Sequence, residues 1–484
     1  MLPKKIKMKR VLQLFMISVF LMGSKSSVNS QYLISCEYVN TTNPLGLSLA
    51  TGLTLQYDID MYKMVYNTVD ALGQPTIASG AFLAPSNTTC VDFPMLVYHH
   101  GTSLRKIDVP SNDVGETTIG RVFGAGGYFV LMPDYIGMGE SPGLHPYCHG
   151  ESEATATRDM IRAAREFIAD SLNMIDNGEL FLTGYSQGGH AAMAAHKYIE
   201  ENNLLSEFNV LGSAPCSGPY EMSGAMADTI LSPYPYSNPG YLVYLLSAYQ
   251  MVYGNLYNSY SDVLNFPYDT IVPPYFDGNN TTLAMGSLNN LLSGYIDTLM
   301  VDTVVANFSN SMSTYNHPLW TALLDNDNHD WTPQRAIRMY YCTGDEQVTF
   351  QNAIAAEATM NANGANDVQA INMGTGDHND CVLPALIAAY YWFDGLRTLC
   401  NATGISEVNS IQKPFAFPNP VNDQLTIHFK GHGLLKITSV LGQEVFSDLV
   451  SGTTYLSTES WDTGVYIVEI QHDNKRLIQR VVKY

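Results

Sequence analysis

The residues best suited to chemistry surround Ser186. It lies in Gly184-Tyr185-Ser186-Gln187-Gly188, after the apolar run 180–183 and before a stretch of helical period over residues 190–199. The glycines allow a turn so tight that a Cβ would collide with neighbouring backbone. A serine raised on such a strand-to-helix turn forms the nucleophile elbow of serine hydrolases. The pattern therefore predicts that Ser186 is the nucleophile of an acyl transfer.

A serine nucleophile needs a base and a group that orients the base. His378 lies in a loop after the strand predicted over residues 367–373, and Asp345 follows the strand predicted over residues 337–342. The chain order Ser186, Asp345, His378 is the order expected when the nucleophile sits on such an elbow. We predict that these three residues form a catalytic triad. Three neighbouring carboxylates stay open as alternatives for the acid: Glu346, Asp377 and Asp380.

The oxyanion that develops during acyl transfer needs backbone N–H donors. The N–H of Gln187 is one candidate, because it follows the nucleophile at the N-terminus of a predicted helix, where negative charge is favoured. The second candidate is the N–H of Thr102 in His100-Gly101-Thr102, after the strand predicted over residues 93–98, with Gly101 as the alternative. We predict an oxyanion hole made by Gln187 and Thr102.

Three other clusters carry residue types that bind metal ions: His99 with His100; His145, Cys148 and His149; and the stretch 325–330. The first pair lacks an evident third ligand. The second cluster could bind zinc, but a loop packed beside the site is the favoured interpretation. The third resembles the start of a calcium loop but lacks its glycine and terminal glutamate. We therefore do not expect a metal ion at these clusters.

The elements that would position these residues alternate between strands and helices. Strands are predicted over residues 93–98, 128–132, 180–183, 209–214, 337–342 and 367–373, and helices over 154–172, 190–199 and 383–396. A further hairpin lies within residues 52–85, with Asp70-Ala71-Leu72-Gly73 as its turn. This alternation implies crossover connections and a mostly parallel sheet in an α/β fold.

Two regions depart from that alternation. Residues 219–332 are dense in Tyr, Pro, Ser and Asn, with helical pieces over 241–253 and 283–299, and they predict a cap inserted after a sheet strand. We expect Tyr and Leu side chains between Tyr234 and Leu299 to line an apolar pocket over Ser186. Residues 416–484 alternate apolar and polar positions between glycine turns, which predicts a separate, small, sandwich-like all-β domain.

Composition limits the classes of partner. The chain has 45 acidic and 24 basic residues and a net charge of −21, which argues against a nucleic-acid partner or an anionic membrane surface. A basic segment and an apolar run over residues 11–23 precede small residues, which predicts a signal peptide over residues 1–30. A lipoprotein box ending at Cys36 is the alternative. No other stretch is long and apolar enough to span a membrane.

Seven cysteines follow the predicted signal peptide, so at least one thiol is left unpaired in an oxidising compartment. Cys342 lies three residues before Asp345, and Cys381 lies three residues after His378. If the acid and the base hydrogen-bond, their loops are neighbours. We predict that a disulfide between these two cysteines joins them.

Residues 50–400 resemble an α/β-hydrolase of the secreted lipase/esterase type. The resemblance rests on the Ser186 elbow, the Thr102 loop, the stretch 133–141 and the loops that carry Asp345 and His378. It implies triad roles for Ser186, Asp345 and His378 and no cofactor. The large Tyr-rich cap departs from the pattern of the family, so the family's substrates are a poor guide to the substrate of this chain.

The tail resembles the C-terminal sorting domain of bacterial type IX secretion. The matching stretches are residues 417–420, 425–427, 441–445, 464–470 and 480–483. The resemblance implies export across the outer membrane by the type IX machinery, and a location that is secreted or attached to the cell surface. A β-sandwich that binds carbohydrate or anchors a surface protein is the alternative.

These observations predict a signal peptide (1–30), an α/β-hydrolase domain (31–403, cap about 219–332), a linker (404–415) and a sorting domain (416–484). The predicted function is hydrolysis of a small-molecule or lipid carboxylic ester through an acyl-enzyme. Two alternatives stay open: a serine peptidase of the prolyl-oligopeptidase type, and an inert surface binding protein.

Overall fold

The computed structural model describes residues 32–312, 314–400, 415–419, 421–439, 443–472 and 475–483. The chain divides into two compact units between Thr403 and Gly404. The predicted signal peptide, and the predicted linker apart from Phe415, lie outside the described residues.

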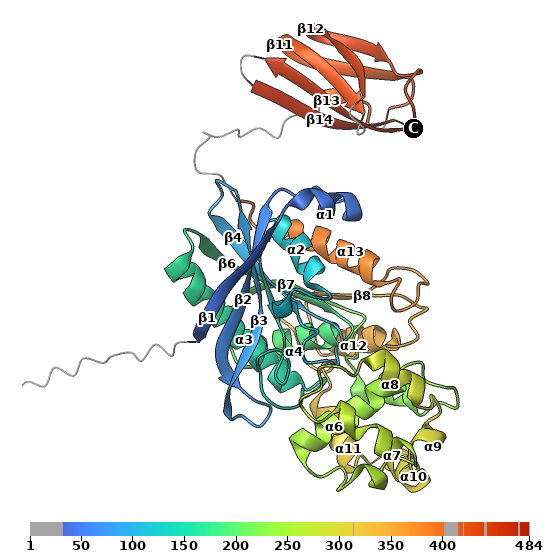
Figure 1. Ribbon diagram of the computed structural model, residues 1–484. Helices are drawn as coiled ribbons and strands as arrows, with labels where there is room; N and C mark the ends of the chain where they lie inside the picture. The colour runs from blue at the N-terminus through green and yellow to red at the C-terminus, as the bar shows by residue number, and fades with distance from the viewer. Residues whose placement is uncertain are drawn as a thin grey trace, which may run out of the picture. The chain divides into compact units, whose positions relative to one another are not determined.

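The first unit is built on a nine-stranded sheet with the order β1-β2-β3-β5-β4-β6-β7-β8-β9 (Figure 1). The strands from β5 to β9 run parallel, whereas β1, β2 and β3 add an antiparallel edge. Their bounds are β1 Leu33–Thr42, β2 Asp58–Val69, β3 Pro75–Ser86, β4 Asp92–His99, β5 Phe129–Pro133, β6 Ile175–Tyr185, β7 Asn209–Cys216, β8 Ala336–Tyr341 and β9 Val368–Asn372. The predicted α/β class with a mostly parallel sheet is confirmed.

Helices cover both faces of this sheet, which explains why its central strands are apolar on both sides. One face is covered by α3 (Gly150–Ser171), α4 (Gln187–Glu201) and α12 (Gln351–Ala362). The other face is covered by α1 (Pro44–Thr51), α2 (Thr117–Ala125) and α13 (Val382–Asp394), as Figure 1 shows. Both layers bury large apolar clusters against the strands, and the carboxyl ends of β4, β6, β8 and β9 are left free to present loops.

A helical cap follows β7 and ends before β8, as predicted. Its helices are α5 (Ala227–Ile230), α6 (Pro239–Tyr253), α7 (Tyr268–Ile271), α8 (Met285–Leu291), α9 (Ile296–Leu299), α10 (Asp302–Asn310) and α11 (Pro318–Asp325). The single helical piece expected over residues 283–299 is wrong, because α8 ends before Gly294 and α9 begins after it. A Cβ at Gly294 would lie 2.7 Å from the Tyr236 carbonyl oxygen, and this close approach separates the two helices.

Several elements were not predicted, among them β1, α2 and α12. Cys36 lies inside β1, where its backbone pairs with Met64, and the strand begins three residues earlier at Leu33. Lipidation of Cys36 at a mature N-terminus would remove the start of this strand.

The second unit is a small all-β domain, as predicted. Its strands are β10 (Ala416–Phe417), β11 (Gln424–Ser439), β12 (Glu444–Ser457), β13 (Gly464–His472) and β14 (Lys475–Lys483), and all pair antiparallel. Alternate residues of β11 and β13, such as Ile437 and Val468, are fully buried in its own core. This unit therefore has the apolar core that an independent domain needs.

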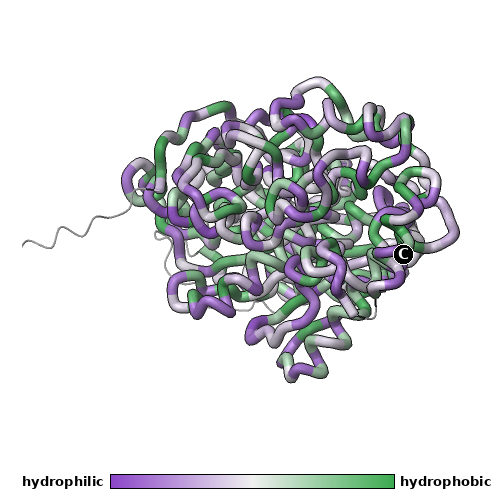
Figure 2. Tube along the Cα trace, turned by 90° about the horizontal axis from the view of Figure 1, so that it is seen from below, coloured by the Kyte–Doolittle hydropathy of each residue, from purple (hydrophilic) through white to green (hydrophobic). Residues whose placement is uncertain are grey.

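Figure 2 shows hydrophilic and hydrophobic residues interspersed along the Cα trace. Within the described residues, no helix combines the length and the apolar character needed to cross a bilayer.

Candidate active site

Ser186 stands between β6 and α4 in a strained backbone conformation, with φ 61° and ψ −122°. Positive φ is uncommon outside glycine and persists only where the surroundings impose it. Here Gly188 makes the turn possible, because a Cβ there would collide with the His99 carbonyl. The Ser186 N–H donates to the Cys216 carbonyl at 3.0 Å, which ties the elbow to β7. The predicted elbow is therefore present at the carboxyl edge of the sheet.

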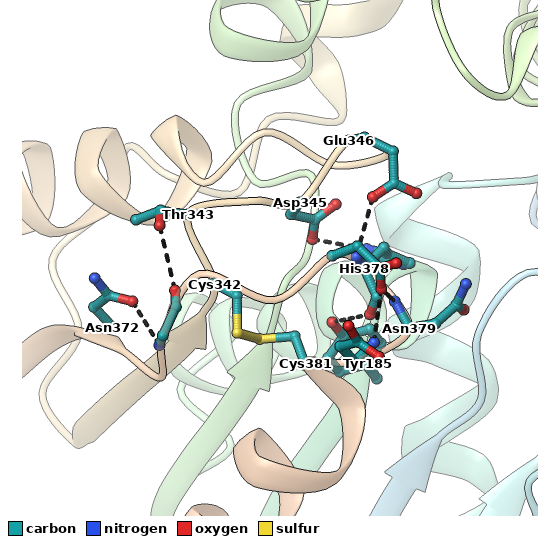
Figure 3. Close-up of a disulfide and its surroundings, with 12 residues drawn as sticks. Tyr185, Cys342, Thr343, Asp345, Glu346, Asn372, His378, Asn379 and Cys381 are labelled. Atoms are coloured by element: carbon teal, nitrogen blue, oxygen red, sulfur yellow. Dashed lines mark hydrogen bonds and ion pairs between the residues drawn. A yellow bond between two sulfur atoms is a disulfide. The ribbon is translucent and has the colours of Figure 1, made fainter.

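Asp345 and His378 are in contact, as Figure 3 shows: Asp345 Oδ2 lies 2.7 Å from His378 Nδ1. Both side chains are almost fully buried. The other oxygen of Asp345 accepts the backbone N–H groups of Gln347 (3.0 Å) and Val348 (2.8 Å), which fixes the carboxylate. His378 Nε2 has no hydrogen-bond partner among the described residues, so this nitrogen remains available to a reacting group.

The three alternative acids have other roles. Asp377 accepts the N–H groups of Asn379 and Asp380 and closes its own turn. Glu346 accepts the backbone N–H of His378 at 3.1 Å and so holds the loop rather than the ring. Asp380 is exposed. Of these carboxylates only Asp345 contacts the imidazole.

The loop that carries His378 is held at two further points. Tyr185 Oη donates to the His378 carbonyl at 2.6 Å, so the residue before the nucleophile also fixes the base. The predicted disulfide between Cys342 and Cys381 is confirmed, with their Cα atoms 5.9 Å apart (Figure 3). A second disulfide joins Cys90 and Cys400. The remaining thiols are those of Cys36, Cys148 and Cys216.

Two backbone N–H groups are suited to an oxyanion. Gln187 is the first residue of α4, and neither its N–H nor that of Thr102 has a partner among the described residues. Gly101, the alternative donor, gives its N–H to Glu116 Oε1 at 3.0 Å. Glu116 also accepts the Tyr98 hydroxyl. The geometry therefore favours Thr102 over Gly101.

The histidines of the two predicted clusters make hydrogen bonds within the protein. His99 contacts the Thr183 carbonyl (3.0 Å) and the Thr157 hydroxyl (2.8 Å), and burial lowers its pKa to about 4. His145 Nδ1 contacts the Ile136 carbonyl at 2.9 Å. His149 contacts Ser152 Oγ at 3.1 Å at the start of α3. These contacts support the loop-packing interpretation.

The stretch 325–330 anchors the cap. The Asn326 side chain accepts the N–H of Gly150 at 2.8 Å, and Asp327 accepts the N–H of Ser223 at 3.0 Å. The Asn328 N–H donates to the Tyr220 carbonyl at 2.8 Å. The polar side chains are thus used to fasten the end of the cap to α3 and to the cap's own beginning.

Sequence reasoning missed a buried pair formed by Glu153 and His190, whose nearest atoms are 2.7 Å apart. Burial opposes both charges, but each partner stabilises the other. The pKa of Glu153 is therefore lowered and that of His190 is raised. Donor atoms of Cys148 lie within 4.8 Å of this pair. The hydrogen bond between the two side chains offsets part of the cost of burying the Glu153 carboxylate.

An apolar cavity lies beside Ser186 and Gln187. Its walls combine Tyr147 and Cys148 with cap residues: Met222, Met226, Tyr236, Tyr241, Leu242, Leu245, Ile296, Met300, Val304, Val305, Phe308, Leu319 and Leu323. The prediction that cap Tyr and Leu side chains line an apolar pocket over Ser186 is confirmed. This lining suits an apolar ligand.

Two known families match parts of the chain. Residues 113–227 match the secretory lipase family, and residues 416–484 match the secretion system C-terminal sorting domain. No significant match is found among curated protein sequences.

Solved structures match a larger share of the chain. The rice cell wall degrading esterase LipA from Xanthomonas oryzae is 26% identical, with a TM-score of 0.68 over 76% of this chain and 99% of that chain. Candida antarctica lipase A in its closed state is 17% identical, with a TM-score of 0.56 over 79% of this chain and 87% of that chain, which shows the fold alone.

The parallel sheet, the strained serine, the inserted cap and these matches agree. The chain is an exported α/β-hydrolase of the lipase/esterase type, a serine hydrolase of carboxylic esters, with a C-terminal type IX sorting domain.

Proposed function

We propose that this enzyme hydrolyses carboxylic esters with an apolar acyl group through Ser186, His378 and Asp345. The contact of 2.7 Å between Asp345 and His378 carries the proposal, because it leaves His378 Nε2 as the nitrogen that can accept a proton. The apolar cavity beside Ser186 supports an acyl chain as the occupant.

In the proposed reaction, Ser186 Oγ attacks the ester carbonyl while His378 Nε2 takes its proton. Asp345 holds the imidazole tautomer and stabilises the imidazolium. The tetrahedral oxyanion is stabilised by the N–H groups of Gln187 and Thr102. When the intermediate collapses, His378 returns the proton to the leaving alcohol, and water then hydrolyses the acyl-enzyme by the same steps.

The test is covalent trapping combined with substitution. An alkyl fluorophosphonate should add one phosphonyl group to the intact enzyme, and a digest should place it on Ser186. Ser186→Ala should not be labelled and should lose about 10⁴-fold or more of kcat against a chromogenic ester. Labelling elsewhere, or full activity of Ser186→Ala, would refute the proposal.

A panel of chromogenic esters with acyl chains of increasing length, run beside chromogenic peptides, tests the substrate. Ester cleavage should rise with acyl length until the cavity is filled, and peptides should not be cleaved. Peptide cleavage that depends on Ser186 would restore the peptidase alternative, and the absence of both activities would restore the inert binding protein.

A further inference from the structure

The segment 145–157, a buried loop and the first two turns of α3, contacts both halves of the proposed oxyanion hole. Tyr147 Oη lies 2.9 Å from Thr102 Oγ1. The Tyr147 ring is buried and stacks on Tyr244 of the cap, with centroids 4.5 Å apart and planes at 7°. The hydroxyl contact therefore ties Thr102, whose N–H has no partner among the described residues, to a buried and stacked ring.

The same segment holds the side chain of Gln187, which is 1% exposed. Gln187 Nε2 lies 3.0 Å from Glu153 Oε1 and 2.7 Å from His145 Nε2. Burial lowers the pKa of His145 to about 4, so the ring is neutral at neutral pH. Because its Nδ1 faces the Ile136 carbonyl and donates there, Nε2 accepts from Gln187. Both amide protons of Gln187 are thus used to fix the side chain.

Glu153 is suited to this contact because it stays charged although it is buried. Its other oxygen contacts His190 Nδ1 at 2.7 Å, and His190 Nε2 contacts the Asn326 carbonyl at 3.0 Å. A hydrogen bond to an ionised carboxylate is stronger than one between neutral groups. The carboxylate therefore holds the Gln187 amide more firmly than a neutral acceptor would.

We propose that Tyr147 and Glu153 are positioning residues of the oxyanion hole, Tyr147 through the Thr102 hydroxyl and Glu153 through the Gln187 side-chain amide. The inference rests on the proposed function, since it takes the N–H groups of Thr102 and Gln187 as the oxyanion donors. Such donors act only when they lie about 2.7–3.1 Å from the oxyanion, so a small displacement lowers transition-state stabilisation but not substrate binding.

Tyr147→Phe removes one oxygen and keeps the ring that stacks on Tyr244 and lines the cavity. We expect kcat to fall about tenfold or more with KM unchanged, because losing a whole donor costs about 10²–10³-fold. Thr102→Val should give a similar loss, and the double variant should be no slower than Thr102→Val alone. Thr102→Ser, which keeps the hydroxyl, should retain activity. Tyr260→Phe is the control: it loses a cap hydrogen bond to Ser247 away from the cavity lining and should be unchanged.

Glu153→Gln keeps the shape of the side chain and removes its charge. We expect a fall in kcat at constant KM, whereas Glu151→Gln, an exposed residue of the same helical turn, should match the wild type. The deciding readout is the Kd of an acyl trifluoromethyl ketone, which forms a tetrahedral adduct with the nucleophile. Its Kd should rise by the same factor as kcat falls, while the Kd of the product acid stays constant.

The inference is overturned if Tyr147→Phe and Glu153→Gln lower the melting temperature but leave kcat and the ketone Kd unchanged, since a purely structural role predicts that result. If Glu153→Gln does not fold, Tyr147→Phe with Thr102→Ser still decides the Thr102 half. Ser186→Ala is assayed in parallel: its inactivity beside normal kcat in Tyr147→Phe refutes only this inference, whereas its full activity refutes the proposed function.

Discussion

At the scale of single residues, the proposed site depends on one strained serine and one oriented imidazole. A backbone conformation like that of Ser186 costs on the order of 1–3 kcal/mol in a residue with a Cβ. The cost is offset by a turn packed between β4, β6 and β7, where glycines let backbone approach backbone. The strain lifts the hydroxyl out of the sheet, where the cavity opens beside it.

Asp345→Asn tests which carboxylate orients His378. The amide cannot stabilise an imidazolium and favours the wrong tautomer, so kcat should fall by about 10³–10⁴-fold with little change in KM. Steady-state kinetics on a chromogenic ester measures this. Asp377→Asn is the matched control, because this carboxylate only closes its own turn, and a severe loss there with near-normal turnover in Asp345→Asn would reverse the assignment.

At the scale of elements, β8 and α13 bring the acid and the base together, and the disulfide between Cys342 and Cys381 joins them. Replacing both cysteines with serine should lower the free energy of unfolding by about 2–4 kcal/mol, since the bridge closes a loop across 39 positions. The turnover number should also fall, because the loops of Asp345 and His378 lose their shared anchor. Urea denaturation and steady-state kinetics measure the two effects.

The second disulfide supplies the control for this prediction. Cys90 precedes β4 and Cys400 follows α13, at the edge of the sheet opposite Ser186. The variant with serine at both positions should lose stability but keep the turnover number. Equal kinetic losses in both double variants would show that the first bridge acts through global stability alone.

The cap helix α6 should limit the length of the acyl chain. Leu245→Trp adds volume to a buried side chain that lines the cavity. Each methylene left unburied costs about 0.8 kcal/mol, so excluding two or more should lower kcat/KM for long-chain esters by about tenfold or more. Acetate esters should be cleaved normally. Leu324→Trp, on the exposed side of α11, should leave the whole chain-length profile unchanged.

At the scale of the whole molecule, the chain separates catalysis from export. Each unit has its own apolar core, so a deletion of residues 404–484 should leave kcat and the melting temperature of the hydrolase unit unchanged. The same deletion should keep the protein in the periplasm, as cell fractionation and esterase assays of each fraction would show. Val468→Asp, which places a charge in the core of the tail, should block export in the same way without changing kcat.

Buried histidines should make the hydrolase unit sensitive to acid. Burial lowers the pKa of His99 and of His145 to about 4, whereas each titrates near 6.5 in the unfolded chain. As pH falls from 6.5 to 4, the unfolded chain takes up protons that the folded chain does not. The free energy of unfolding should therefore decrease, by up to about 1.4 kcal/mol per pH unit for each residue.

The effect of His190 on the free energy of unfolding has the opposite dependence on pH, because its pKa is raised in the folded state. Its stabilising contribution is complete below pH 6.5 and is lost as the pH rises through its folded pKa. Urea denaturation at intervals between pH 7 and pH 4.5 measures the acid side. Constant or rising stability over that interval would contradict the assignment of neutral, buried His99 and His145.

The sequence alone determined the features that depend on local chemistry. Gly184 and Gly188 predicted the elbow, because only glycine tolerates such close contact with neighbouring backbone. The roles of Ser186, Asp345 and His378 were predicted from their order and from the short apolar runs, predicted as strands, that precede them. The pairing of Cys342 with Cys381 was predicted from the expected contact between the acid and the base. The alternating tail was visible for the same reason, since a period of two is local.

Only the tertiary structure decided matters that depend on packing between distant segments. Among the acids near His378, the choice of Asp345 depended on which oxygens the loop backbone already used. Glu153 looked like an ordinary polar residue at the start of a helix, because its partner His190 lies 37 positions away and neither charge shows its burial in the sequence. The cavity beside Ser186 likewise forms only when several short cap helices pack together over the sheet. The sequence of each short helix does not show which of its sides faces the cavity.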